Sequence, residues 1–106
     1  MAHVNLRLPQ NVRGDLYVDS SCIDCDTCRW IAPDVFNRTG GQSVVYHQPG
    51  NAAERLRSLQ ALLACPTSSI GTLDKPKDIK DAQLSFPDGA TSALKPMYRR
   101  ELTELW

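Results

Sequence analysis

Several common functional signatures are missing from these 106 residues. There is no glycine-rich phosphate loop, no His-Glu-x-x-His motif and no nucleophile elbow, so the sequence shows no recognisable catalytic centre. Lys and Arg number 12, as do Asp and Glu, so no net charge draws the chain to nucleic acid. No apolar run approaches the roughly 20 residues that cross a bilayer. We expect a small, soluble, monomeric domain that is not an enzyme and binds neither nucleic acid nor membrane.

Cysteine is scarce, but its spacing is specific. Cys22, Cys25 and Cys28 form a C-x-x-C-x-x-C run, and a fourth cysteine, Cys65, stands directly before Pro66. Three thiolates at this spacing let one loop wrap a cubane, while the fourth iron takes its thiolate from a distant part of the chain. The proline holds that last cysteine at a turn. These four cysteines are therefore predicted to bind a [4Fe-4S] cluster.

The sequence predicts one cluster rather than two. In chains that bind two, the run continues as C-x3-C-P, and the local Cys-Pro serves the second cluster. Here Ala32 and Pro33 fill that position. The proline is kept and the ligand is lost, so we expect one electron per cycle.

Disulfides, a zinc site and plain buried thiols are the alternatives for the same cysteines. Cysteines two apart in a tight loop are poorly placed to bridge each other, and residues 1–10 carry no secretory signal pattern. Zinc usually takes two separated close pairs of ligands, which a triple run plus one distant cysteine does not supply. His47 is more simply a solvated residue of a polar turn. Thiolate ligands imply a reducing compartment, so we expect a cytoplasmic or plastid stromal protein.

The order of predicted elements is β-α-β-β-α-β. A short strand at 15–19 leads into the cysteine loop, and one helical turn follows at 29–32. Residues 37–41 carry two glycines and predict a hairpin turn into a strand at 43–46. We expect a ferredoxin-like α+β fold, with Trp30 and Phe36 packed over the cluster.

The second helix has the clearest boundaries. Asn51 is a good N-cap, and Glu54 is placed to reach back to it. The helix must end by Cys65, because Pro66 cannot continue its hydrogen bonding. Apolar residues fall on one stripe that faces the core, and a returning strand follows at 69–73; the stripe is Ala52, Leu56, Leu59 and Leu63.

The composition changes after Asp74. Residues 1–74 are predicted to form the [4Fe-4S] domain, and residues 75–106 a basic, proline-containing tail with a possible terminal helix. The tail has an apolar stripe at helical spacing, which either packs on this domain or docks a partner: Leu94, Tyr98, Leu102 and Leu105.

Acidic residues are concentrated around the cysteine run. Residues 15–34 hold five aspartates against one arginine, Arg29. Asp24 and Asp26 lie between the cysteines, so we expect an acidic rim that attracts a basic redox partner.

Beyond the spacing, the chain resembles a known family. The strings LYVDSSCIDCDTCRWIAPDVF, SVVYHQP and LQALLACPTSSIGT are similar to the ferredoxin-type domain that precedes metallo-β-lactamase-fold hydrolases in cyanobacteria and plastids. KPKDIKDAQLSFP resembles the connector of that family. The resemblance implies a single [4Fe-4S] cluster on Cys22, Cys25, Cys28 and Cys65. After Pro87 the similarity ends, and the histidine-rich zinc motif of the hydrolase is absent.

Two functions remain open from the sequence. The first is a one-electron carrier that exchanges electrons with a partner docked near the cysteine loop. The second is an iron–sulfur-stabilised interaction or sensory module for a separate partner, such as a metallo-β-lactamase-fold hydrolase.

Overall fold

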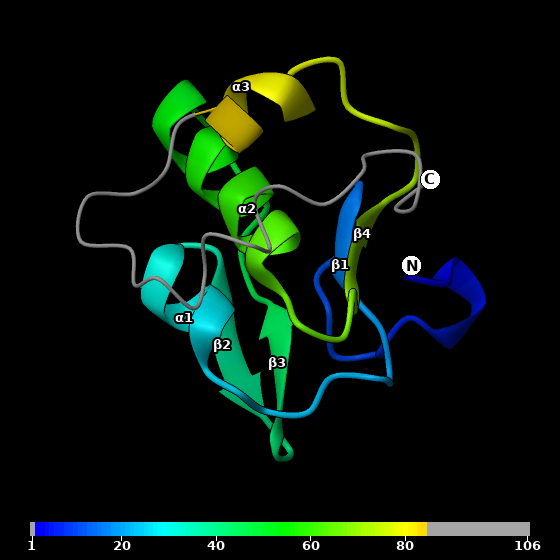
Figure 1. The fold of residues 1–106 in the computed structure, drawn as a ribbon. Helices are drawn as coiled ribbons and strands as arrows, with labels where there is room; N and C mark the ends of the chain where they lie inside the picture. Colours follow the sequence, from blue (N-terminus) through cyan, green and yellow to red (C-terminus); the bar gives the residue numbers. More distant parts are fainter. Residues whose placement is uncertain (1, 85–106) are drawn as a thin grey trace.

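The computed structural model describes residues 2–84, with the side chains of Gln83 and Leu84 left out. The fold combines two small antiparallel sheets with three α-helices (Figure 1). The elements follow in this order: η1 Val4–Leu6, β1 Leu16–Val18, α1 Thr27–Ile31, β2 Phe36–Thr39, β3 Gln42–Val45, α2 Ala52–Ala64, β4 Ile70–Thr72 and α3 Ile79–Leu84. The predicted β-α-β-β-α-β order and the α+β class are confirmed.

The first sheet joins the segment before the cysteine loop to the segment after Cys65. β1 and β4 pair antiparallel, with Leu16 opposite Thr72 and Val18 opposite Ile70. Asp19 follows β1 and is 1% exposed. Its backbone N–H donates to Ser69 O at 2.8 Å, which extends the pairing by one residue. The cysteine loop and the end of α2 are thus held side by side.

The second sheet is the predicted hairpin. β2 and β3 pair from Phe36 opposite Val45 to Thr39 opposite Gln42. Gly40 and Gly41 form the turn with φ of +62° and +83°, values that glycine adopts without steric cost. The two glycines therefore fix the hairpin register, as the sequence indicated.

Helix α2 begins and ends where its caps predict. The side chain of Asn51 accepts a hydrogen bond from Glu54 N at 2.9 Å, and Glu54 Oε1 accepts one from Gly50 N at 2.9 Å. The reciprocal bond thus reaches one residue further back than expected. Ala64 is the last helical residue, and Cys65 is extended. The second half of the helix is buried on all sides rather than along a stripe: Ser58, Leu59, Gln60, Ala61, Leu62, Leu63 and Ala64.

Helix α3 was not predicted. Its Ile79 is 2% and its Ala82 0% exposed, and both belong to the hydrophobic core. Figure 1 shows α3 beside the first turns of α2, where Arg55 Nε of α2 lies 2.6 Å from Asp78 Oδ2. The domain boundary at residue 74 remains a prediction, but residues beyond it supply core side chains. The apolar stripe expected at residues 94–105 lies outside the described residues.

The structure describes no helix long and apolar enough to span a membrane within residues 2–84.

Gly71 of β4 is a site where a larger residue should not fit. A Cβ built there would lie 2.8 Å from Ala2 Cβ and 2.9 Å from Tyr17 Oη, and Tyr17 is only 3% exposed. We expect Gly71→Ala to lower the free energy of unfolding by about 1–3 kcal/mol, as overpacked sites do. Denaturant unfolding measures this. The matched control is Gly50→Ala, because a Cβ there meets nothing closer than 3.7 Å; equal losses in both variants would contradict the packing argument.

Candidate metal centre

The four cysteines come from three places in the chain and meet at one cavity. Cys22 and Cys25 lie in the loop after β1, Cys28 is in α1, and Cys65 caps the end of α2. All four line the same cavity, together with apolar residues that include Val18 and Ile70 of the paired strands. None of the four forms a disulfide in the structure. The sequence-predicted residues are therefore brought together by the fold.

The four thiols differ in exposure. Cys28 is 7% and Cys65 8% exposed, Cys22 is half-buried, and Cys25 faces solvent. Burial raises the pKa of the Cys28 thiol to about 11, an effect that the Ser43 hydroxyl partly offsets. The metal-free thiol is therefore protonated at neutral pH, and metal binding there must release its proton.

Backbone amides point at two of the sulfurs. The N–H groups of Asp24 and Ser43 both donate to Cys22 Sγ at 3.4 Å, and Ser69 N–H donates to Cys65 Sγ at 3.3 Å. Hydrogen bonds to sulfur are one of the means by which a protein tunes an iron–sulfur cluster. The donor set therefore fits thiolate ligands.

The cysteine loop contains two unusual backbone turns. Asp24 and Asp26 have φ of +58° and +70°, the left-handed region that non-glycine residues rarely enter. Aspartate tolerates this region better than most residues, because its short polar side chain bonds locally. These turns coil the chain between Cys22 and Cys28, so that their sulfurs reach the same cavity.

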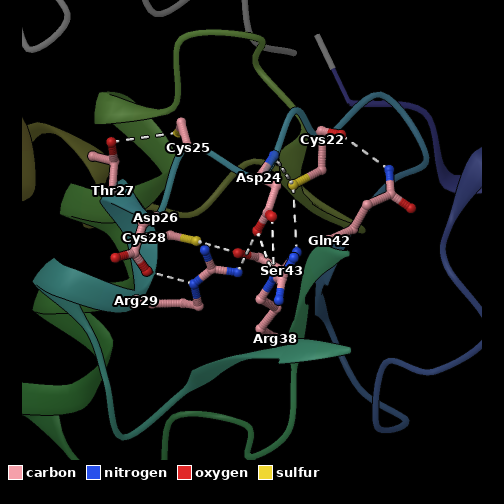
Figure 2. Close-up of polar contacts among 10 residues, drawn as sticks. All are labelled: Cys22, Asp24, Cys25, Asp26, Thr27, Cys28, Arg29, Arg38, Gln42 and Ser43. Atoms are coloured by element: carbon pink, nitrogen blue, oxygen red, sulfur yellow. Dashed lines mark hydrogen bonds and ion pairs between the residues drawn. The ribbon is translucent and has the colours of Figure 1, made fainter. Parts of the chain in front are cut away.

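The loop is also tied to the hairpin. Gln42 Nε2 of β3 donates to Cys22 O at 3.0 Å (Figure 2). It also donates to Ser20 O at 3.0 Å. The next residue, Ser43, donates its N–H to Cys22 Sγ, and its Oγ accepts from Cys28 Sγ at 3.2 Å. Sequence reasoning missed Gln42 and Ser43, because nothing in a hairpin sequence indicates which distant loop it contacts.

Two aspartates of the expected acidic rim form ion pairs. Asp24 lies 2.8 Å from Arg29 Nη1 and 3.0 Å from Arg38 Nε, and Asp26 lies 2.6 Å from Arg29 Nε. The Arg29 guanidinium holds the pKa of the Asp24 carboxyl below its usual range, with help from Arg38. Asp19 is buried and caps neighbouring backbone, with Oδ2 accepting from His3 N at 3.0 Å. Asp24 and Asp26 are therefore paired with arginine side chains, and an acidic rim that attracts a basic partner stays a prediction.

Neither of the two aromatic residues predicted to pack over the cluster lines the cysteine cavity. Trp30 is 70% exposed and is not part of the cavity lining, because helix α1 turns its other face to the core. Phe36 is 2% exposed and belongs to the hydrophobic core. Ile23, which sequence reasoning did not single out, lines the cavity while being 61% exposed.

Within the described part of the chain, no three His, Cys, Asp or Glu side chains are close enough to share one metal ion. The cysteines instead stand around the wall of the cavity, with Cys22 and Cys28 on the Ser43 side and Cys65 beside Ser69.

Four cysteines around one cavity, in an α+β fold with amides directed at sulfur, form the arrangement expected of an iron–sulfur protein of the ferredoxin type. The family model described as the 4Fe-4S single cluster domain of ferredoxin I matches residues 18–72, more than half of the chain. The chain belongs to that family, whose domains are iron–sulfur electron carriers. No curated protein and no solved structure matches the chain.

Proposed function

We propose that this protein carries one electron at a time on a single [4Fe-4S] cluster held by Cys22, Cys25, Cys28 and Cys65. The observation that supports this most is that all four cysteines line one cavity. When bound, the cluster would supply a centre that accepts and returns one electron. With all four irons bound to protein thiolates, no coordination position is left for a substrate, which favours a carrier over an enzyme.

The chain's own residues would set the environment of the cluster. Cys28 and Cys65 are buried, so two ligands exclude water. Cys25 is exposed, so the edge of the cluster next to it is the shortest route for an electron to a partner. We place the docking site of that partner at this loop. The partially neutralised loop weakens the case for a strongly basic partner.

The second candidate is a structural or sensory role. Cys28 of α1 and Cys65 at the end of α2 belong to the same hydrophobic core, so a cluster would also tie the two helices together. The resemblance to a domain fused to metallo-β-lactamase-fold hydrolases makes a separate hydrolase of that fold a candidate partner. A cluster that cannot be reduced reversibly, but whose loss unfolds the chain, would favour this role over electron transfer.

The test is anaerobic purification followed by metal analysis and voltammetry. We expect about four irons and about four acid-labile sulfides per chain, with zinc near zero. We also expect a reversible one-electron wave. One zinc and no sulfide after anaerobic reconstitution would overturn the cluster assignment, whereas a full cluster without reversible reduction would overturn only the carrier role.

A further inference from the structure

Two arginines from different elements bind the carboxylate between the first two cysteines. Arg29 of α1 reaches Asp24 Oδ1 with Nη1 at 2.8 Å, and Arg38 of β2 reaches Asp24 Oδ2 and Oδ1 with Nε at 3.0 and 3.3 Å (Figure 2). Arg29 also holds Asp26 through Nε at 2.6 Å. Both aspartates of the cysteine run are thus bound to cations, and one of these cations, Arg38, comes from the β2–β3 hairpin.

The two arginines differ in burial. The Arg29 side chain is 14% exposed, whereas that of Arg38 is 62% exposed. Arg29 Nη1 is buried and makes no hydrogen bond of good geometry. Its polar contact is the ion pair with Asp24 Oδ1. A part-buried ion pair that loses one partner leaves an uncompensated charge, while an exposed pair contributes little. Removing Arg29 should therefore have the larger effect.

The residues that these arginines hold are the ones in left-handed turns. Asp24 and Asp26 have φ of +58° and +70°. These conformations raise the free energy of the loop backbone, and other interactions must offset that increase. Arg29 bridges the two turns, and Arg38 ties the first of them to the hairpin. Two positive and two negative side chains leave this network with no net charge. Without the arginines, the two aspartates would leave two uncompensated negative charges in the cysteine loop.

We infer that Arg29 and Arg38 are positioning residues which hold the cysteine loop closed on the cluster and whose charges raise its reduction potential. The inference rests on the proposed function, because it requires a cluster on these cysteines. Reduction adds negative charge to the cluster, so a nearby cation favours the reduced state and a nearby carboxylate opposes it. A purely structural role would change how fast the cluster is lost without moving its potential.

The test compares four variants of the full chain, each reconstituted anaerobically. Arg29→Gln and Arg38→Gln remove one cation each, and Arg38→Lys keeps the charge but not the two contacts of Nε with Asp24. Arg57→Gln is the matched control. Arg57 is exposed on α2, so this substitution removes the same charge at a place away from the loop. Voltammetry gives the potential, and transfer of iron to a chelator gives the rate of cluster loss.

We expect both glutamine variants to lower the potential, with Arg29→Gln lower than Arg38→Gln. Cluster loss should accelerate about tenfold or more in Arg29→Gln and by less than about fivefold in Arg38→Gln. Arg38→Lys should keep the wild-type potential while still losing its cluster faster than the wild type. Arg57→Gln should match the wild type in both measurements.

Three results would overturn the inference. They are unchanged potentials in both glutamine variants, an equal fall in Arg57→Gln, or unchanged rates of cluster loss. If Arg29→Gln cannot be loaded with a cluster, the comparison of Arg38→Gln with Arg38→Lys still tests the inference. Failure of the wild type to hold iron and sulfide would instead refute the proposed function, so the two failures are distinguishable.

Discussion

Replacing Cys65 with alanine is expected to reduce the iron content of the anaerobically prepared protein from about four to about three per chain or fewer. Cys65 is the only cysteine outside the run, and Pro66 ends helix α2 so that Cys65 adopts an extended conformation at φ −65° and ψ 117°. No other cysteine can replace it. Iron and sulfide analysis, with electron paramagnetic resonance to detect a three-iron cluster, measures the outcome.

Thr67→Ser is the control for the Cys65 variant. The Thr67 hydroxyl lies 3.6 Å from Cys65 Sγ, and serine keeps that group while changing the side chain beside the cavity. The control should retain about four irons. A full cubane in Cys65→Ala would show that the distal ligand is another residue.

Replacing Ile79 with alanine is expected to lower the free energy of unfolding by about 2–5 kcal/mol, the range for large-to-small changes in a core. Ile79 is 2% exposed and belongs to the same core as Leu59 and Leu62 of α2. For a domain of this size the melting temperature should fall by about 8 °C or more. Thermal unfolding of the cluster-loaded protein measures the shift.

Lys80→Ala is the matched control, because Lys80 lies next to Ile79 in α3 but is exposed. It should leave the melting temperature within a degree or two, as exposed substitutions with no buried contact usually do. Truncation adds a second comparison: a chain ending at Leu84 should melt well above one ending at Leu73, which lacks α3. An unshifted melting temperature in Ile79→Ala would mean that α3 does not pack on α2 in solution. Iron content of the shorter chain tests whether residues beyond 74 are dispensable for the cluster.

The sequence predicted the parts of the fold that depend on local chemistry. Cysteine spacing indicated which thiols meet, Asn51 marked the start of α2, and paired glycines marked the hairpin turn. Each of these is a short-range rule in which a residue type determines its own backbone or that of a close neighbour. The sequence placed Cys65 near the other three cysteines only because a four-cysteine ligand set requires it. The ligand role itself stays a proposal.

What the sequence did not predict depends on contacts between distant segments. Arg38 lies in β2, and only the folded hairpin brings it to Asp24. Ile79 and Ala82 sit among lysines, aspartates and a proline, so the buried face of α3 is hidden in a composition typical of a linker. Trp30 was expected to pack over the cluster, yet its place on the outer face of α1 leaves it exposed.

The burial of Cys28 and Cys65 has a consequence for how the protein matures in a cell. Their helices, α1 and α2, contact each other, and both cysteines belong to the core that the contact closes. A cluster held by these two sulfurs would be part of that core, so its loading would be coupled to the folding of the chain. A chain made without iron and sulfide should stay incompletely packed and be degraded, so its abundance should follow the supply of clusters.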